Sequence, residues 1–224
     1  MKDIAVILSG CGRADGSEIH ESVCTLLALS EAGVPARIFA PDMEQKQVID
    51  HLSGDKMNGK RNVLTEAARI ARGDITPLAE LNINEVSAVI LPGGKGAALN
   101  LCTYDSDGID CDIQPDVKRV LSAAMKKKIP LGFICIAPVL AARVAKELGM
   151  SLTLTIGNDP STAKDIRALG CKHKSSDVHK CVVDATNRVV STAAYMSAEN
   201  IAEAYSGIGC LVKETVKMIE SRTA

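Results

Sequence analysis

Leu131-Gly-Phe-Ile-Cys135-Ile-Ala-Pro-Val-Leu140 joins two patterns of hydrophobicity. Residues 131–136 form a short apolar run, which predicts a buried β-strand. After Pro138 the apolar residues recur at helical spacing until Gly149, which predicts a helix that begins directly after the strand. One cysteine, Cys135, therefore lies at a sharp turn from strand to helix.

A sharp turn of this kind exposes its central side chain at the carboxyl edge of a sheet, as the nucleophile elbows of hydrolytic enzymes do. The N-terminus of the following helix would lower the pKa of the Cys135 thiol and favour the thiolate. The alternative is that Cys135 is a small buried hydrophobic residue, since free cysteines are often buried. The position alone leaves both interpretations open.

Short apolar runs and helical patterns alternate through nearly the whole chain. Buried strands are predicted at residues 4–8, 36–40 and 86–91, with helices between them. This alternation predicts an α/β fold with a doubly wound, mostly parallel sheet and helices on both faces, in one domain over residues 1–224. Ligands of such sheets bind at the carboxyl ends of the strands.

The composition limits the classes of partner. The chain has 224 residues, 46% of them hydrophobic, and its net charge of −1 with no Trp gives no basis for binding nucleic acid or an anionic membrane. No apolar run is long enough to span a bilayer, and no signal or transit peptide precedes the strand that begins at Ile4. Eight scattered cysteines are expected to stay reduced, so we expect a cytoplasmic protein.

The first predicted helix carries a candidate acid. Asp15 and Glu18 are spaced as a capping pair, and the expected core face consists of Ile19, Val23, Leu26 and Leu27. Glu21 lies in the second turn, where its carboxyl group could share a proton with a nearby thiol. The alternative is a solvated helix glutamate.

Three loops are expected to meet at the carboxyl edge of the sheet: the loop after the first strand, Pro92-Gly-Gly-Lys-Gly96 and the turn at Cys135. Glycines leave backbone N–H groups uncovered, which suits an oxyanion site. An ordinary tight turn is the alternative for this loop.

A variant dinucleotide fingerprint lies at Gly10-Cys-Gly12-Arg-Ala-Asp-Gly16, with Asp42 as a candidate ribose ligand. The acidic side chains at the start of the first helix would repel a pyrophosphate. We therefore expect no cofactor.

Cys171, His173, His179 and Cys181 have the only zinc-like spacing in the sequence. The intervening sequence is short and polar, so a surface hairpin without metal is favoured. The acidic segment 103–116 lacks the glutamate and the spacing of a calcium loop, and we interpret it as a solvated loop able to cover the site.

Taken together, these loops resemble a known superfamily. Val89-Ile-Leu-Pro-Gly-Gly94, Gly96-Ala97, Asn100-Leu101 and Gly132-Phe-Ile-Cys135-Ile-Ala-Pro138 are similar to the PfpI/ThiJ superfamily of class I glutamine amidotransferase-like proteins. Five further strings resemble its ElbB branch, whose members are often labelled isoprenoid-biosynthesis proteins: Ile7-Leu-Ser-Gly-Cys-Gly12, Asp15-Gly-Ser-Glu-Ile-His-Glu21, Arg61-Asn-Val-Leu64, Leu154-Thr-Ile-Gly157 and Ala194-Tyr-Met196. The resemblance covers essentially the whole chain.

The resemblance implies a flavodoxin-like fold and a homodimer. It also implies that Cys135 is the nucleophile, that Glu21 is the catalytic acid, and that the backbone N–H groups of Gly94 and Ile136 form an oxyanion pocket. Members of the branch have been assigned a glutathione-independent glyoxalase activity of the lyase class, from glyoxal to glycolate, with protein deglycation as a competing description.

The chain departs from the superfamily pattern at one position. Members with a Cys–His pair carry the histidine after the strand that follows the elbow helix, and here Thr155-Ile-Gly157 contains none. A glutaminase or protease would lack its base. His20 is the nearest substitute, and Asn100 is a supporting residue of the superfamily-like string.

Three hypotheses remain open at this point. In the first, the Cys135 thiolate attacks a small aldehyde substrate and Glu21 transfers protons. In the second, Cys135 is a redox sensor whose oxidation changes a partner contact. In the third, the chain is a partner-binding amidotransferase-like subunit linked to isoprenoid metabolism, without turnover.

Overall fold

A seven-stranded sheet forms the centre of the computed structural model, which describes residues 2–221. In spatial order its strands are β3 (Thr76–Pro77), β2 (Ala36–Ala40), β1 (Ile4–Ile7), β4 (Ala88–Leu91), β5 (Leu131–Ile134), β9 (Val189–Thr192) and β8 (Cys181–Asp184). All neighbours are parallel except β8, which forms the predicted antiparallel hairpin with β9. The predicted fold class is confirmed. The strand order reverses between β1 and β4, which opens a crevice at their carboxyl ends.

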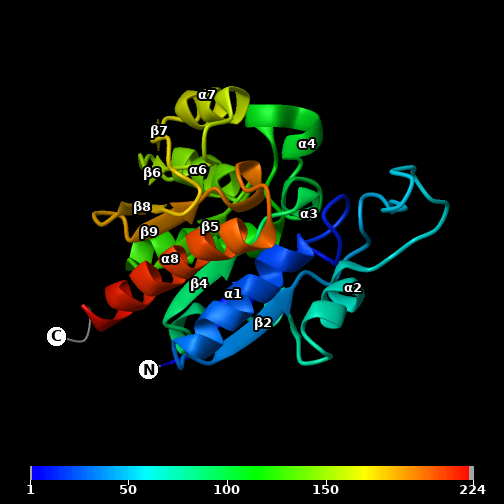
Figure 1. Cartoon of the computed structure of the whole chain (residues 1–224), viewed down its shortest axis with the longest axis horizontal. Helices are drawn as coiled ribbons and strands as arrows, with labels where there is room; N and C mark the ends of the chain where they lie inside the picture. Colours follow the sequence, from blue (N-terminus) through cyan, green and yellow to red (C-terminus); the bar gives the residue numbers. More distant parts are fainter. Residues whose placement is uncertain (1, 222–224) are drawn as a thin grey trace.

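Helices cover both faces of the sheet (Figure 1). The helices α1 (Ile19–Glu31), α2 (Val63–Ile70) and α8 (Ile201–Glu220) pack on one face, and α5 (Pro115–Lys127) and α6 (Pro138–Glu147) pack on the other. Successive residues of β1 alternate between the two cores: Ile4 and Val6 face α1 and α8, while Ala5 and Ile7 face α5 and α6.

Several smaller elements complete the fold. They are α3 (Lys95–Leu99), α4 (Tyr104–Asp107), α7 (Pro160–Ala168), a separate sheet of β6 (Thr153–Leu154) and β7 (Lys172–His173), and the 3-10 helices Leu78–Glu80, Ile83–Glu85, Gly108–Asp110 and Ala194–Met196. The strand β6 spans only two residues and does not join the central sheet.

The predicted core face of α1 is wrong. Ile19, Val23 and Leu27 are 42%, 49% and 47% exposed. The buried face consists instead of Glu21, Ser22, Cys24, Thr25, Ala28 and Leu29. Polar residues can be buried there because Ser22 and Thr25 donate hydrogen bonds to the carbonyl groups one turn earlier (both 2.7 Å).

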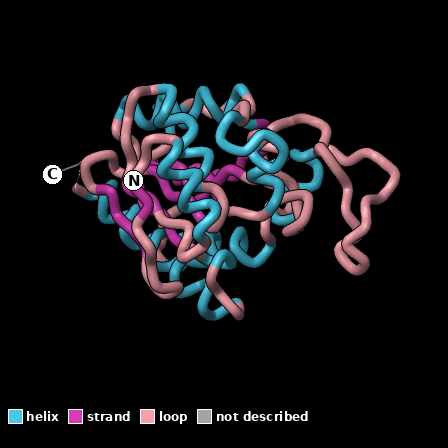
Figure 2. Tube along the Cα trace, turned by 90° about the horizontal axis from the view of Figure 1, so that it is seen from above, coloured by secondary structure: helices cyan, strands magenta, loops and turns pink. Residues whose placement is uncertain are grey.

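An arm of residues 43–62 projects from the body of the protein (Figure 2). Isolated β-bridges hold its two sides together, Glu44 with Asn62 and Ile49 with Lys56. Its base is attached to the loop after β1, where the Asp15 carboxylate accepts a hydrogen bond from the N–H of Ile49 (2.8 Å). Asp15 therefore does not cap α1. Glu18 does so alone, by accepting from the N–H of Glu21.

The C-terminal helix α8 runs without interruption through Gly207 and Gly209. A disulfide joins Cys210 of α8 to Cys181 of β8, so the expectation that all eight cysteines stay reduced is wrong for this pair. Within residues 2–221, no helix has the length and apolar character that crossing a membrane requires.

Candidate active site

Cys135 lies at the turn between β5 and α6, as the sequence predicts. Its φ of +62° is in the left-handed region, which a non-glycine residue rarely adopts. The turn is held on both sides, because the N–H of Cys135 donates to the carbonyl of Thr192 (3.0 Å) and the N–H of Ala137 donates to that of Ile134 (3.0 Å). This backbone aims the thiol at the carboxyl edge of the sheet.

Glu21 is fully buried against this thiol. One carboxyl oxygen accepts a hydrogen bond from the N–H of Gly93 (2.9 Å), and the other accepts from the N–H of Tyr195 (3.2 Å). The carboxyl group also shares a hydrogen bond with Cys135. The alternative of a solvated helix glutamate is therefore excluded.

The thiol and the carboxyl group both hold their protons more tightly than usual. Burial raises the pKa of Glu21 to about 7. Burial, followed by the charge of Glu21 and its hydrogen bond, raises the pKa of the Cys135 thiol well above its usual value. The predicted lowering of the thiol pKa is wrong, because burial and the neighbouring carboxylate outweigh the favourable backbone groups. Near neutral pH the thiol is therefore protonated, and the carboxyl group changes its protonation state.

The backbone N–H groups of Gly94 and Ile136 both face the sulfur of Cys135, where they act to lower its pKa. The glycines of the 92–96 loop allow this approach. A Cβ at Gly93 would lie 2.5 Å from the Cβ of Cys135 and 2.8 Å from the Glu21 carboxylate, and one at Gly94 would lie 2.2 Å from the nitrogen of Glu18. Any larger residue would push the loop away from the thiol.

His20 and Asn100, the two residues expected to support catalysis, lie in different parts of the structure. His20 is exposed on α1, and its Nδ1 lies 2.7 Å from the hydroxyl of Tyr195. Asn100 is buried away from the thiol and holds the loop after β1, donating to the carbonyls of Ser9 and Asp15 (both 2.9 Å). Asn100 therefore positions a loop and does not line the cavity beside Cys135.

The fingerprint-like loop 10–16 uses its polar groups internally. The N–H of Gly12 donates to Ser17 (2.9 Å), and the carbonyls of Arg13 and Gly16 accept from Lys95 and Gly96 (both 2.8 Å). Asp42 accepts a hydrogen bond from Asn62 (2.7 Å). This loop is a wall of the site.

The zinc-like residues do not come together. Cys171 is buried, and Cys181 is in the disulfide. Across residues 2–221, no group of three or more His, Cys, Asp or Glu side chains has the arrangement of a metal site.

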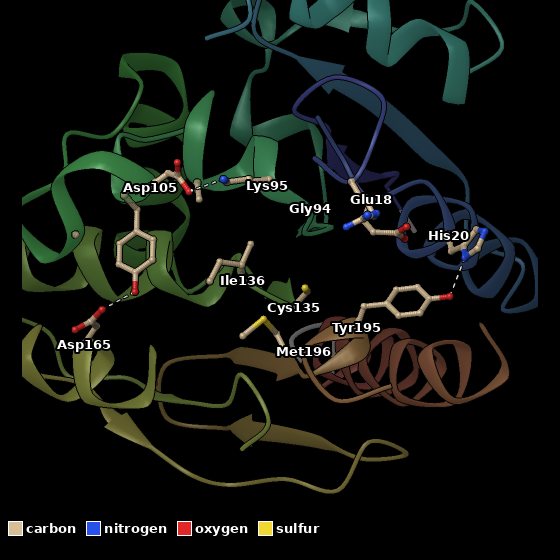
Figure 3. A pocket seen from close by; sticks show the side chains of 14 residues that line it. Glu18, His20, Gly94, Lys95, Asp105, Cys135, Ile136, Asp165, Tyr195 and Met196 are labelled. Atoms are coloured by element: carbon tan, nitrogen blue, oxygen red, sulfur yellow. Dashed lines mark hydrogen bonds and ion pairs between the residues drawn. The ribbon is translucent and has the colours of Figure 1, made fainter. Parts of the chain in front are cut away.

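A cavity of about 810 Å³ opens beside Cys135 (Figure 3). Besides Cys135, Ile136, Gly94 and His20, residues that the sequence did not single out as site residues line it: Arg13, Glu18, Lys95, Ala98, Tyr104, Asp105, Gly108, Asp165, Tyr195 and Met196. Two pairs of lining side chains hold each other in place. The Tyr104 hydroxyl donates a hydrogen bond to Asp165 (2.6 Å), and Lys95 forms an ion pair with Asp105 (3.2 Å). The acidic segment near residue 105 does cover the site, as expected.

Known proteins resemble the chain along almost its full length. No model of a protein family matches it. The ES1 protein homolog, mitochondrial, of Rattus norvegicus is 44% identical over 96% of this chain and 83% of its own length. The chain belongs to the ES1 family. The human glutamine amidotransferase-like class 1 domain-containing protein 3, mitochondrial, is also 44% identical, over 96% of the chain and 82% of its own length.

Solved structures have the same fold as this ES1-family chain. A crystal structure of an isoprenoid biosynthesis protein with amidotransferase-like domain from Ehrlichia chaffeensis has a TM-score of 0.89 and 34% identity, covering 96% of this chain and 99% of that one. DJ-1beta of Drosophila melanogaster, at 15% identity and a TM-score of 0.55 over 100% of this chain and 99% of its own, shares the fold. The predicted superfamily and its ElbB-like branch are confirmed.

The expected cytoplasmic location is wrong. The rat, human and Danio rerio relatives are all named as mitochondrial proteins. The expectation was based on the absence of a membrane span, on the absence of a recognisable targeting peptide and on cysteines assumed to be reduced, and these features do not determine the compartment.

Proposed function

We propose that this chain is a glutathione-independent enzyme of the glyoxalase type, which converts small α-oxoaldehydes to hydroxyacids through Cys135. One observation carries the proposal: the fully buried Glu21 carboxyl group shares a hydrogen bond with a thiol at a strained elbow that opens into a cavity. A nucleophile with an adjacent base is the arrangement that covalent catalysis requires.

In the first step, Glu21 takes the proton of the Cys135 thiol while the sulfur attacks the aldehyde carbon. The aldehyde oxygen carries negative charge as the bond forms, and Glu21 then gives it the proton taken from the thiol, so that the product is a neutral hemithioacetal and Glu21 is again a carboxylate. The backbone N–H groups of Gly94 and Ile136 face the sulfur and can donate to this oxygen. The strained φ of Cys135 keeps the sulfur between these donors and Glu21.

In the second step, Glu21 removes the hydrogen of the former aldehyde carbon as a proton and returns it to the neighbouring carbonyl carbon, while the hydroxyl proton of the hemithioacetal passes to the oxygen of that carbonyl. The first carbon is oxidised to a thioester and the second is reduced to an alcohol, so no external oxidant or reductant is needed. Water then hydrolyses the thioester, releasing the hydroxyacid and restoring the thiol. A pKa of about 7 allows Glu21 to accept and donate protons near neutral pH.

The test is hydroxyacid production from methylglyoxal by purified protein without glutathione. Cys135→Ala is expected to abolish turnover, and Glu21→Gln to reduce it by about 10²–10⁴-fold, the usual contribution of a general base. Cys171→Ala, at a buried free cysteine outside the cavity lining, is the matched control and should retain activity. Wild-type product no higher than in buffer, or full turnover by Cys135→Ala, would contradict the proposal.

The redox-sensor alternative is less well supported. Peroxide oxidises the thiolate, and the raised pKa of the buried Cys135 keeps this thiol neutral near pH 7. The hypothesis of a subunit linked to isoprenoid metabolism is supported only by the name of the Ehrlichia protein. Rapid stoichiometric oxidation of Cys135 by dilute peroxide, without any turnover of aldehydes, would favour the sensor.

A further inference from the structure

The cavity beside Cys135 is much larger than glyoxal or methylglyoxal requires. Its volume of about 810 Å³ lies in the range of pockets that enclose drug-sized ligands. A two- or three-carbon dicarbonyl compound would contact only the part around Cys135 and leave the remaining walls in contact with water. The side chains on those walls therefore indicate which chemical groups a larger substrate would have.

The part of the cavity formed by α3, α4 and α7 is rich in polar groups, and we call it the polar lobe: Lys95, Tyr104, Asp105 and Asp165. Figure 3 shows the Lys95–Asp105 pair and Asp165 on one side of Cys135, and His20 with Tyr195 on the other. The lobe is thus continuous with the thiol but separate from the histidine pair.

The internal contacts of the polar lobe leave much of its hydrogen-bonding capacity available. Tyr104 donates to one oxygen of Asp165 (2.6 Å), and Lys95 contacts one oxygen of Asp105 (3.2 Å). Each carboxylate keeps further acceptor sites, and the ammonium group keeps further N–H donors. Donors and acceptors are therefore interspersed. A row of hydroxyl groups matches such a surface, since each hydroxyl both donates and accepts.

Other kinds of substrate tail fit less well. A phosphate or carboxylate tail would face two carboxylates and one ammonium group in the polar lobe, which is a net repulsion. Arg13 and Glu18 also line the cavity, and their opposite charges leave its net charge negative. An apolar tail would cover the polar groups without satisfying them, which is unfavourable for each group left without a partner.

We propose that the substrate of this site is a 2-oxoaldehyde with a polyhydroxylated chain, of the kind that sugars form when they lose water. This inference depends on the proposed function. The aldehyde carbon lies at Cys135, and the hydroxyl groups bind to Lys95, Tyr104, Asp105 and Asp165. The chemistry is the same as above: water adds overall, the aldehyde becomes a carboxylate, the ketone becomes an alcohol, and the hydroxylated chain is unchanged.

The experiment compares kcat/KM for methylglyoxal, 3-deoxyglucosone and 2-oxohexanal, the last having an apolar chain of matched length. The polyhydroxylated compound is expected to exceed 2-oxohexanal by roughly tenfold or more, the equivalent of one or two net hydrogen bonds. In Tyr104→Phe and Asp165→Asn, the ratio of kcat/KM for 3-deoxyglucosone to that for methylglyoxal should fall roughly fivefold or more. Asp110→Asn, an exposed carboxylate of the same segment outside the cavity lining, is the control.

The outcomes separate this inference from the proposed function. Turnover of methylglyoxal without preference for the hydroxylated chain overturns the inference and leaves the function standing. If wild type turns over none of the three compounds, the proposed function fails. Calorimetry of 3-deoxyglucosone with Cys135→Ala then tests whether the polar lobe still binds a polyhydroxylated compound. Binding that weakens when Asp165→Asn is added supports the polar lobe as a polyol site, and absence of binding overturns it.

Discussion

Glu21 combines three features that rarely occur together: full burial, two backbone N–H donors and a thiol within hydrogen-bond reach. The N–H groups of Gly93 and Tyr195 favour the carboxylate, while burial favours the protonated form more strongly. The balance gives a carboxyl group that changes protonation near neutral pH. Such a group suits proton transfer, and it also makes the stability of the protein depend on pH.

The pKa of Glu21 is raised to about 7, whereas an unfolded glutamate titrates near about 4.3. The folded state therefore binds the extra proton between these values. The stability contribution is complete below about pH 4 and is lost as the pH rises to about 7. Its full size is about 3–4 kcal/mol, from a shift of between two and three units. Glu21→Gln, which cannot ionise, should therefore gain stability relative to wild type as the pH rises.

The measurement is urea unfolding of wild type and Glu21→Gln at about pH 5 and 8, comparing the difference between the two proteins at each pH. Subtracting the unfolding free energy of one protein from that of the other at each pH cancels the contributions of the other titrating groups. Glu31→Gln, an exposed glutamate on the same helix, is the control and should show no such change. An equal wild-type-to-variant difference at both pH values would contradict the raised pKa.

At the scale of single elements, α8 contains two glycines that the sequence does not distinguish. A Cβ at Gly207 would lie 2.5 Å from the carbonyl oxygen of Val178 and 2.6 Å from the hydroxyl of Thr192, whereas one at Gly209 would meet nothing within 4 Å. Gly207→Ala should cost about 1–3 kcal/mol of unfolding free energy. Gly209→Ala should add up to about 1 kcal/mol, because alanine favours the helix. Chemical denaturation of both variants measures this contrast, and equal effects would contradict the packing of α8.

The disulfide between Cys181 and Cys210 fixes the same helix to the edge strand β8. The two cysteines are separated by 29 residues, so closing this loop should stabilise the folded protein by about 2–4 kcal/mol relative to the reduced chain. Cys210→Ser should lower the thermal midpoint, and reductant should lower it in wild type but leave Cys210→Ser unchanged. A wild-type midpoint that does not respond to reductant would show that the pair is not bonded in solution.

Residue patterns predict some elements of this fold and fail for others, for identifiable reasons. The strands are short apolar runs bounded by Gly, Pro or charged residues, so their positions are visible in the sequence. The face of α1 is not, because Ser22 and Thr25 satisfy their hydroxyl groups within the helix and can be buried like apolar residues. The β6 segment resembles a core strand but is paired to β7, a choice that depends on tertiary packing.

At the scale of the whole molecule, the sequence likewise predicts the position of some residues of the candidate site and not of others. Cys135, Gly94 and Ile136 lie on loops that immediately follow strands, so the parallel sheet brings them together whatever the details of packing. Tyr195 comes from the 3-10 helix Ala194–Met196 and Asp165 from α7, and no local sequence pattern predicts that these segments approach the cavity. The polar lobe could therefore be found only in the folded structure.

The outward face of α1 leads to the last prediction, which concerns assembly. Ile19, Val23 and Leu27 are spaced four residues apart, so they form one exposed apolar stripe along the helix. In a symmetric dimer the same surface of each copy can pack against its counterpart. We expect the homodimer implied by the superfamily resemblance to form through this stripe, since it would remove these side chains from water.

Val23→Asp would place a charge in the middle of that interface, so it should raise the dimer dissociation constant by about 100-fold or more, equivalent to about 3 kcal/mol. Val183→Asp is the matched control, because Val183 is a similarly exposed apolar residue, 40% accessible, on the edge strand β8. Sedimentation velocity over a concentration series distinguishes the two. A wild-type monomer at every concentration would contradict the dimer. Loss of the dimer in Val183→Asp but not in Val23→Asp would move the interface to β8.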